Sequence, residues 1–264
     1  MEIKGIFFDF DWTLFDHKVR DFVPSAIKAI HYIQQKGVKV FINSARTYYS
    51  LEGLKTFDKF NFDGFVTSNG GVALLKDKTL YSYTLSDELE NKLLEIAKKN
   101  NLSFVAKTLD KEYISIKDKT IVDKFYSIFF EPFPLNFEKR NKNEKIVSFQ
   151  FIMNPALEYL LKDLDNCYIN HYYEDAYEIT SKEFHKAEGI EKIIEELHFK
   201  KENLAAFGDD LNDISMFNLV KYGICMGNGN PQAKLHAKYV TSNIEDDGIL
   251  NGLKYLGLIG DDFK

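Results

Sequence analysis

Ile6-Phe7-Phe8-Asp9-Phe10-Asp11-Trp12-Thr13-Leu14 is the stretch from which the organisation of this chain can be inferred. Its first three residues are apolar on both faces and end abruptly in charge, which is typical of a short, fully buried strand. Asp9 and Asp11 follow where this strand ends, and open α/β sheets bind ligands beyond the carboxyl ends of their strands. Two carboxylates this close repel each other, so the stretch predicts a bound cation or a raised pKa. The alternative is a solvated acidic turn.

The chain that follows alternates between helices and strands. A helix is expected to begin at Pro24 and to end before Gly37. Strands are expected at 38–42 and 65–66, with a second helix between them. This order predicts right-handed crossovers and a parallel sheet, whose strand ends lie at one edge. The polar residues that close the three strands are Asp9, Ser44 and Ser68.

The pattern changes in the middle of the chain and returns later. Short alternating runs, a few residues apart, predict paired strands between residues 82 and 183, with a helix at 155–164 among them. After that, a helix at 189–197 precedes a strand at 204–207 that ends in Gly-Asp-Asp. We therefore expect an α/β core domain from residues 1–81 and 184–264, interrupted by an α+β domain at 82–183.

Composition narrows the class of protein. The chain has 264 residues, of which 45% are hydrophobic, so it can bury a sizeable core. Its net charge of −6 argues against nucleic acid or an anionic membrane as a partner. Its polar N-terminal residues do not resemble a signal peptide, and no apolar run approaches ~18 residues. We therefore expect a cytoplasmic protein.

Four separated pieces of the core end strands or begin helices and carry reactive groups. Carboxylates at this density suit Mg²⁺, which prefers a few carboxylates plus water and substrate phosphate. A lysine and a hydroxyl beside such a site suit phosphate, because one supplies charge and the other a hydrogen bond. The pieces are Asp9-Phe10-Asp11-Trp12-Thr13, Ser44, Lys186 and Gly208-Asp209-Asp210-Leu211-Asn212-Asp213.

These pieces, in this order, resemble the haloacid dehalogenase-like (HAD) phosphohydrolases, and among them the Cof-type family with a class II, type B cap. The motifs that carry the resemblance are Asp9-x-Asp11-x-Thr13-Leu14, Asn43-Ser44-Ala45-Arg46, Ser68-Asn69-Gly70, Lys186, Gly208-Asp209-x-x-Asn212-Asp213, Met226-Gly227-Asn228-Gly229-Asn230 and Asp246-Asp247-Gly248. The resemblance implies a three-layer, Rossmann-like parallel-sheet core, with the inserted α+β domain as its cap. The sequence departs from the family pattern at Trp12, Ala45 and Ala187, where the family usually has glycine.

The resemblance also implies roles for individual residues. Asp9 would be the nucleophile, and Asp11 the acid that protonates the leaving group and then the base that activates water. Arg46 would reach the substrate or pair with a surface acid. Groups expected to bind the phosphate are Ser44, the backbone of Ala45, Lys186 and Asn212. Groups expected at the Mg²⁺ ion are Asp9, Asp11 through its carbonyl, Asp209 and Asp213.

Each of these residues also has a simpler interpretation. Taken alone, Lys186 is more typical of a solvated lysine at a helix start, and only its place in the series of motifs favours the site. Ser44 is also typical of a helix cap, and Asp213 of an acid in a first helical turn.

Three hypotheses for the function follow. The first is an Mg²⁺-dependent phosphatase that hydrolyses a small phosphorylated metabolite, such as a sugar phosphate, through an aspartyl-phosphate. The second is a phosphotransferase or phosphomutase on the same scaffold. The third is a non-catalytic regulatory protein that binds phosphate.

Overall fold

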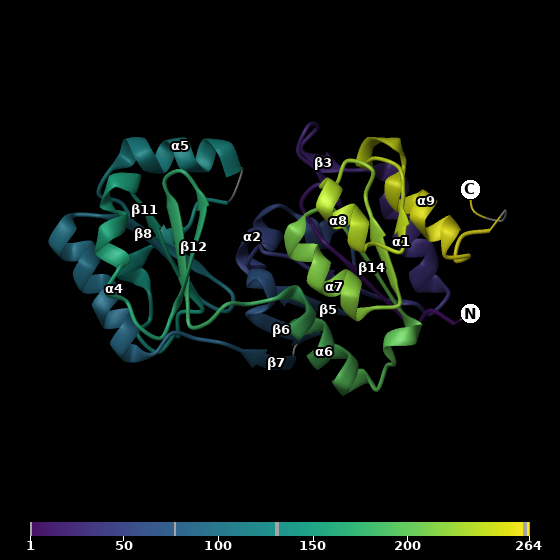
Figure 1. Ribbon diagram of the computed structural model, residues 1–264, viewed down its shortest axis with the longest axis horizontal. Coiled ribbons are helices and arrows are strands. Elements are labelled where there is room, and N and C mark those ends of the chain that lie inside the picture. Colours follow the sequence, from purple (N-terminus) through teal and green to yellow (C-terminus); the bar gives the residue numbers. More distant parts are fainter. Residues whose placement is uncertain (1, 77, 130–131, 261–262, 264) are drawn as a thin grey trace. The chain divides into compact units, whose positions relative to one another are not determined.

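The structure, a computed structural model, describes residues 2–76, 78–129, 132–260 and 263. It divides into two units, shown in Figure 1. Unit 1 comprises Met1–Arg46, Thr56–Tyr81 and Phe184–Lys264, and unit 2 comprises Thr47–Lys55 and Ser82–Glu183. The short segment Thr47–Lys55, which lies within the expected core domain, therefore clusters with unit 2.

Unit 1 is built on an eight-stranded sheet with the order β16-β15-β14-β1-β4-β5-β6-β7. The six strands from β16 to β5 run parallel to their neighbours, and β6 is antiparallel to β5. The strands are β1 (Gly5–Phe8), β4 (Lys39–Asn43), β5 (Gly64–Thr67), β6 (Val72–Leu75), β7 (Lys78–Ser82), β14 (Leu204–Gly208), β15 (Tyr222–Cys225) and β16 (Tyr239–Val240).

Helices cover both faces of this sheet. Phe7 of β1 packs in one apolar cluster with residues of α6, α7 and α8, whereas Phe8 stacks on Phe207 on the opposite face, where α9 packs closely. This alternation along β1 produces the three layers expected from the sequence. The helices of unit 1 are α1 (Pro24–Gln35), α3 (Thr56–Lys59), α6 (Lys186–Leu197), α7 (Ile214–Leu219), α8 (Pro231–His236) and α9 (Gly248–Tyr255).

Unit 1 also contains a short hairpin and several 3₁₀ turns. A small hairpin that the sequence analysis does not predict, β2 (Phe15–Asp16) and β3 (Asp21–Phe22), follows the acidic stretch. The 3₁₀ turns are η1 (Ser68–Gly70), η4 (Lys201–Asn203), η5 (Leu211–Asp213) and η6 (Ile244–Asp246).

Unit 2 contains a six-stranded sheet with the order β10-β9-β8-β11-β13-β12. Most neighbouring strands are antiparallel, as the paired runs predict. The strands are β8 (Ser103–Lys107), β9 (Glu112–Ser115), β10 (Leu135–Asn136), β11 (Ser148–Ile152), β12 (Tyr168–Tyr173) and β13 (Ala176–Thr180).

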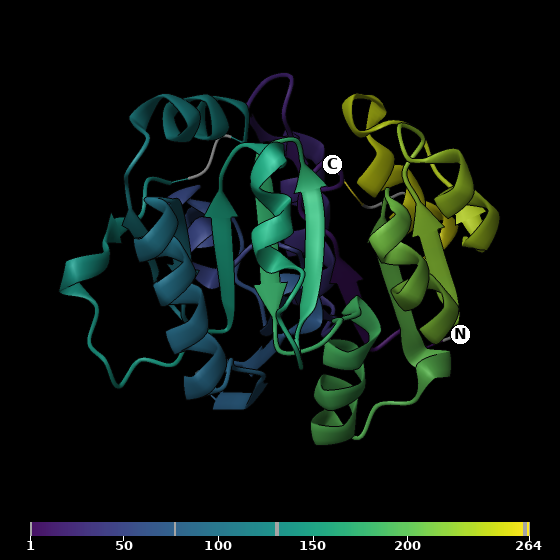
Figure 2. The ribbon, with the colours of Figure 1, turned by 60° about the vertical axis from the view of Figure 1, so that its left-hand side comes forward.

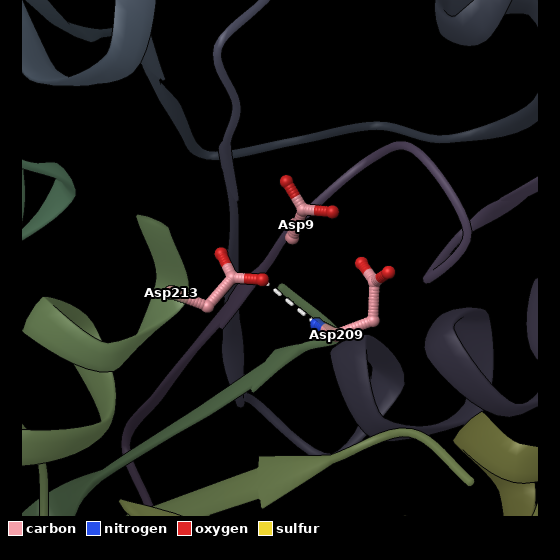
Figure 3. A group of neighbouring side chains, drawn as sticks. All are labelled: Asp9, Asp209 and Asp213. Carbon is pink, nitrogen blue, oxygen red and sulfur yellow. Dashed lines mark hydrogen bonds between the residues drawn. The ribbon is translucent and has the colours of Figure 1, made fainter. Parts of the chain in front are cut away.

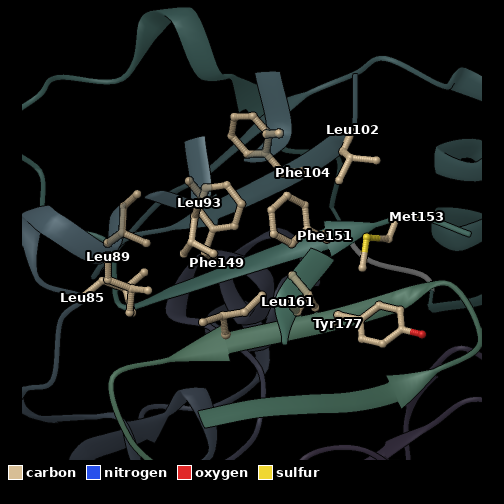
Figure 4. Packing of buried hydrophobic residues seen from close by; sticks show 14 residues of the cluster. Leu85, Leu89, Leu93, Leu102, Phe104, Phe149, Phe151, Met153, Leu161 and Tyr177 are labelled. Atoms are coloured by element: carbon tan, nitrogen blue, oxygen red, sulfur yellow. The ribbon is translucent and has the colours of Figure 1, made fainter. Parts of the chain in front are cut away.

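The larger apolar cluster of unit 2 lies on one face of its sheet, and a smaller cluster that includes Val122 and Phe125 of α5 (Lys119–Phe129) lies on the other. Figure 2 shows α4 (Asp87–Asn100) and η3 (Pro155–Leu161) over the face of the larger cluster. Figure 4 shows how Leu89 and Leu93 of α4 meet phenylalanines of the strands. The segment expected as a helix at 155–164 is thus a shorter 3₁₀ helix. The remaining elements are α2 (Tyr48–Gly53) and η2 (Phe137–Lys139).

None of the helices in the described part of the chain combines the length and the apolar composition that a membrane crossing requires.

Candidate active site

Three carboxylates meet at the carboxyl-terminal edge of the central sheet of unit 1. Asp9 follows β1, Asp209 follows β14, and Asp213 closes η5. Among the described residues, these are the one group of His, Cys, Asp or Glu side chains close enough to share a metal ion, with ligand atoms within 4.8 Å of one another. Figure 3 shows the three carboxylates grouped together.

Backbone amides hold Asp213 in this group. Its Oδ2 accepts hydrogen bonds from the N–H groups of Asp209, at 2.7 Å, and Asp210, at 3.0 Å. Asp213 therefore caps the start of its own turn, as the simpler interpretation predicts, and its Oδ1 is still directed at Lys186.

Lys186 bridges two of the carboxylates. Its side chain is fully buried, and its Nζ lies 2.5 Å from Oδ1 of Asp9 and 2.5 Å from Oδ1 of Asp213. Burial lowers the pKa of Lys186, but Asp213 and Asp9 more than compensate, so its pKa is raised above the ordinary value. Lys186 is thus a permanent cation inside the site and not a solvated lysine at a helix start.

Gly70 allows the backbone of the turn at residues 68–70 to pass close to the backbone just before Lys186. Gly70 has a φ of +103°, and a Cβ there would lie 2.2 Å from the carbonyl oxygen of His185. Asn69 also donates a hydrogen bond from Nδ2 to the carbonyl of Phe184, at 3.3 Å. The Ser68-Asn69-Gly70 turn therefore places the first turn of α6, and with it the lysine, beside Asp9.

Burial and mutual repulsion shift the pKa values of two of the carboxyls. Burial, together with Asp213 and Asp11, raises the pKa of Asp9 to about 7 although Lys186 opposes the shift. Burial, together with Asp9 and Asp213, raises the pKa of Asp209 to about 9. Oxygen ligands at this spacing fit a divalent cation such as Mg²⁺, whose charge would remove the repulsion that produces these shifts.

The side chain of Asp11 lies outside this group. Arg46 donates from Nε to Oδ2 of Asp11, at 2.9 Å, and from Nη2 to Oδ1, at 2.8 Å. Nε2 of His17 lies 2.6 Å from the same Oδ1. Burial alone would raise the pKa of Asp11, but the hydrogen bond to His17 and the charge of Arg46 lower it to about 2. Asp11 is therefore a carboxylate in this arrangement, and Arg46 pairs with it and not with a surface acid.

The loop after Asp9 has a tight backbone. The carbonyl of Phe10 accepts from the N–H groups of Leu14, at 2.9 Å, and Phe15, at 2.8 Å. Trp12 adopts a left-handed conformation with φ of 59°, which costs a residue with a side chain about 1–2 kcal/mol. Asn228 donates to the carbonyl of Trp12 at 2.9 Å, so the Gly227-Asn228-Gly229 turn supports the loop. Trp12 thus takes up a backbone conformation that suits glycine.

Thr13, Ser44, Ala45 and Asn212 surround this arrangement. Thr13 donates from Oγ1 to Oδ1 of Asp209 at 3.2 Å. Ser44 is buried, and its Oγ accepts from the N–H of Arg46 at 3.1 Å, so it shapes the turn before α2. The cap of α2 is Thr47, not Ser44. Ala45 and Asn212 are exposed, and Asn212 contacts Asn69.

His17 is the residue that the sequence analysis missed. It lies directly after β2 and contacts Asp11, six positions earlier in the chain. No second histidine or cysteine at a ligand spacing marks it in the sequence, so only the fold of the β2–β3 hairpin reveals it.

Comparison with known proteins agrees with these motifs. A family model described as haloacid dehalogenase-like hydrolase matches residues 6–253. YkrA of Bacillus subtilis, a predicted phosphatase by name, is 27% identical to this chain over 259 residues. The match covers 98% of this chain and 100% of YkrA. Phosphoglycolate phosphatase 1 of Saccharolobus solfataricus is 29% identical over 248 residues, which cover 94% of this chain and 92% of that protein.

A solved structure extends the similarity to three dimensions. BT4131, described as a sugar phosphatase of HAD subclass IIB, matches with a TM-score of 0.78 at 26% identity, over 97% of this chain and 100% of BT4131. Sequence motifs, sheet topology and a family model that spans most of the chain therefore agree, and the chain belongs to the haloacid dehalogenase-like hydrolases.

Proposed function

We propose that this protein is an Mg²⁺-dependent phosphatase that hydrolyses a small phosphomonoester, such as a sugar phosphate, through an aspartyl-phosphate on Asp9. The observation that carries this proposal is the buried Asp9 at the end of β1, which is bonded to the buried Lys186 and grouped with Asp209 and Asp213. Relatives named as a phosphoglycolate phosphatase and a sugar phosphatase support a small phosphorylated substrate.

In the first step, a carboxylate oxygen of Asp9 attacks the phosphorus atom in line with the ester oxygen. An acyl-phosphate bond forms at Asp9 while the bond between phosphorus and the ester oxygen breaks. Lys186, which already contacts Asp9, stabilises the negative charge of the transferring group. The buried Ser44, the backbone N–H of Ala45 and the side chain of Asn212 are proposed as further phosphate contacts.

The leaving oxygen takes its proton from Asp11, and Asp11 then accepts a proton from the water that attacks the phosphoenzyme. This second attack releases phosphate and restores Asp9. Because Arg46 holds Asp11 as a carboxylate here, the proposal requires the Arg46 contact to loosen when substrate binds, so that Asp11 takes up a proton from solvent before it gives one to the leaving oxygen. We therefore propose that Arg46 turns to the substrate at that stage.

Asp9, Asp209 and Asp213, with the backbone carbonyl of Asp11, are proposed to hold the Mg²⁺ ion. A bound Mg²⁺ supplies positive charge that reduces the repulsion between an anionic nucleophile and an anionic substrate. Residues 82–183 are proposed as the cap on which the choice of substrate depends, and the cytoplasm as the place of action.

The test is phosphate release from a panel of phosphomonoesters, with Mg²⁺ and with a chelator, by wild type, Asp9→Asn and Asp58→Asn. Asp58 is an exposed aspartate outside the site and serves as the matched control. We expect release that needs Mg²⁺, survives in Asp58→Asn and is abolished in Asp9→Asn. Undiminished release by Asp9→Asn, or no release from any ester by a folded wild-type protein, would contradict the proposal.

A further inference from the structure

His17 and Asp11 form a contact that none of the family motifs contains. Nε2 of His17 lies 2.6 Å from Oδ1 of Asp11. Because a carboxylate can only accept, the hydrogen of this bond belongs to His17, and Nε2 is the donor. Oδ1 also receives Nη2 and Nε of Arg46, at 2.8 and 3.1 Å, and Oδ2 receives Nε, at 2.9 Å. The two oxygens of Asp11 are therefore not equivalent.

The ring of His17 is held in place by aromatic neighbours. Its centroid lies 5.0 Å from that of Trp12, at an interplanar angle of 36°, and 5.1 Å from that of Phe15, at 82°. Phe15 in turn stacks on Phe10 at 5.3 Å. These contacts fix the plane of the imidazole, and thus the direction in which Nε2 donates.

The hairpin that carries His17 is also held. Oδ1 of Asp16 accepts from the N–H of Lys18 at 2.8 Å, and Nζ of Lys18 lies 2.5 Å from a carboxylate oxygen of Glu245. Asp16 is buried, and its carbonyl also accepts from the N–H of Arg20 at 2.7 Å, so hydrogen bonds constrain the turn on which His17 sits. A histidine on such a support can orient its partner without contacting the substrate.

We propose that His17 is a positioning residue, which holds Oδ1 of Asp11 so that Oδ2 remains as the oxygen that exchanges a proton with the leaving group. The inference rests on the proposed phosphatase function. It goes beyond that function because it assigns separate tasks to the two oxygens of Asp11. When Arg46 releases Asp11, His17 is the contact that keeps the carboxyl from rotating toward Asp9.

Leaving groups of different basicity separate this role from a purely structural one. The alkoxide released from an alkyl ester needs a proton in the transition state, whereas p-nitrophenolate is stable without one. Misplacing Asp11 therefore lowers kcat/KM, which covers the steps up to the phosphoenzyme, for glycerol phosphate and leaves kcat/KM for p-nitrophenyl phosphate largely intact. A variant that merely loosens the site slows both esters equally.

The experiment measures kcat and KM for both esters, with Mg²⁺, in wild type, His17→Phe, His17→Gln and His17→Ala. Phenylalanine keeps the ring packing and lacks the donor, and glutamine offers an Nε2 donor at a similar reach. We expect His17→Phe and His17→Ala to lower kcat/KM for glycerol phosphate by about 10–100-fold, with kcat/KM for p-nitrophenyl phosphate changed less than about 3-fold. His17→Gln should restore part of the loss.

The matched control is His31→Ala. The ring of His31 is exposed, forms a hydrogen bond with the carbonyl of Lys59 and lies edge-on to Phe60, outside the candidate site, so both esters should react at the wild-type rate. Equal losses on both esters in the His17 variants, or no loss, would overturn the inference while leaving the phosphatase proposal intact. An inactive wild-type protein would instead overturn the proposed function. Should His17→Phe fail to fold, the comparison of His17→Gln with His17→Ala decides.

Discussion

At the level of single residues, Lys186 determines the balance of charge in the candidate site. Its ammonium group lies between Asp9 and Asp213, and all three side chains are buried. A buried ion pair contributes little net stability compared with an apolar replacement of the whole set, but removing one partner leaves the other charges uncompensated. The lysine is therefore important to the fold as well as to the proposed reaction.

We expect Lys186→Met to lower the free energy of unfolding by about 3–5 kcal/mol, because two buried carboxylates lose their cation. Phosphatase activity should fall to background in the same variant. Urea unfolding followed by circular dichroism measures the first effect. Lys192→Met, on the exposed side of the same helix, is the matched control and should unfold near the wild-type midpoint. Equal midpoints for the two variants would show that the Lys186 bridge does not stabilise the protein.

Sequence reasoning reached some of these residues and not others, for physical reasons. Asp9, Asp209 and Asp213 follow strands whose hydrophobic patterns are clear, so topology predicts that they meet, whereas Lys186 is reached only through the resemblance to the family. The Asp11 contact with His17 depends on the shape of a hairpin of two-residue strands, which leaves no periodic pattern. The left-handed backbone of Trp12 is likewise set by its neighbours, because aromatic residues rarely adopt it alone.

At the level of elements, the parallel strands are the most predictable part of the chain. A short, continuous apolar run with a polar end fits few structures other than a buried strand. Helix α6 begins at Lys186, three residues before the expected start, since its first turn is the site itself and carries no apolar stripe. The sequence pattern does not predict helix α5, and it predicts a longer helix where η3 forms. Both lie in unit 2, where short mixed segments leave the helical period weak.

The packing of α6 on β5 gives a prediction at this scale. A Cβ at Gly189 would lie 2.2 Å from Cγ1 and 2.6 Å from Cγ2 of Val66. We expect Gly189→Ala to destabilise the protein by about 1–3 kcal/mol through overpacking, although alanine favours a helix by up to about 1 kcal/mol.

A double-mutant cycle separates the two effects of that substitution. In a Val66→Ala background the methyl groups that the new Cβ meets are absent, so Gly189→Ala should cost clearly less there than in wild type. Chemical denaturation of the wild type, the two single variants and the double variant provides the four free energies. Strict additivity would show that the close approach of helix and strand does not limit this position.

At the level of the whole molecule, each unit has its own sheet and its own apolar cluster. The change from parallel to paired strands is the feature of the sequence that predicts an inserted domain. Segment 47–55 was the exception, because it lies between two strands of the central sheet. Its contacts are nevertheless with unit 2: Thr47 bonds to Glu112, and the hydroxyl of Tyr49 donates to the carbonyl of Phe133 at 2.9 Å. Contacts between side chains distant in sequence decide such a boundary, and the hydrophobic periodicity of the sequence does not predict these contacts.

The raised pKa values predict how global stability responds to pH without a divalent cation. A carboxyl whose pKa is higher in the folded chain stabilises the fold below its unfolded pKa of about 4, and this contribution is lost as the pH rises through the folded pKa. For Asp9 and Asp209, with folded pKa values of about 7 and about 9, the loss extends from about pH 4 to pH 9. We expect the free energy of unfolding in chelator to fall by more than about 1.4 kcal/mol between pH 5 and pH 9, the equivalent of one pKa unit.

Two comparisons check this expectation. Asp209→Asn removes one of the titrating groups and should flatten the decline. Mg²⁺ added to the wild type at pH 9 should restore its stability, because an ion bound to the folded chain stabilises it. Equilibrium unfolding in urea at each pH provides the values. A decline of the same size in Asp209→Asn and wild type would assign it to groups elsewhere in the chain.

The packing of Trp12 against His17 has an optical consequence. Trp12 is the single tryptophan of the chain, so every photon of indole fluorescence that the protein emits originates in the loop after Asp9. An imidazole at ring-contact distance is a potential quencher whose effect depends on its charge and distance. The emission of the unlabelled protein therefore reports directly on events at this loop. Titrations with cations or phosphate esters can be followed there without attaching a dye.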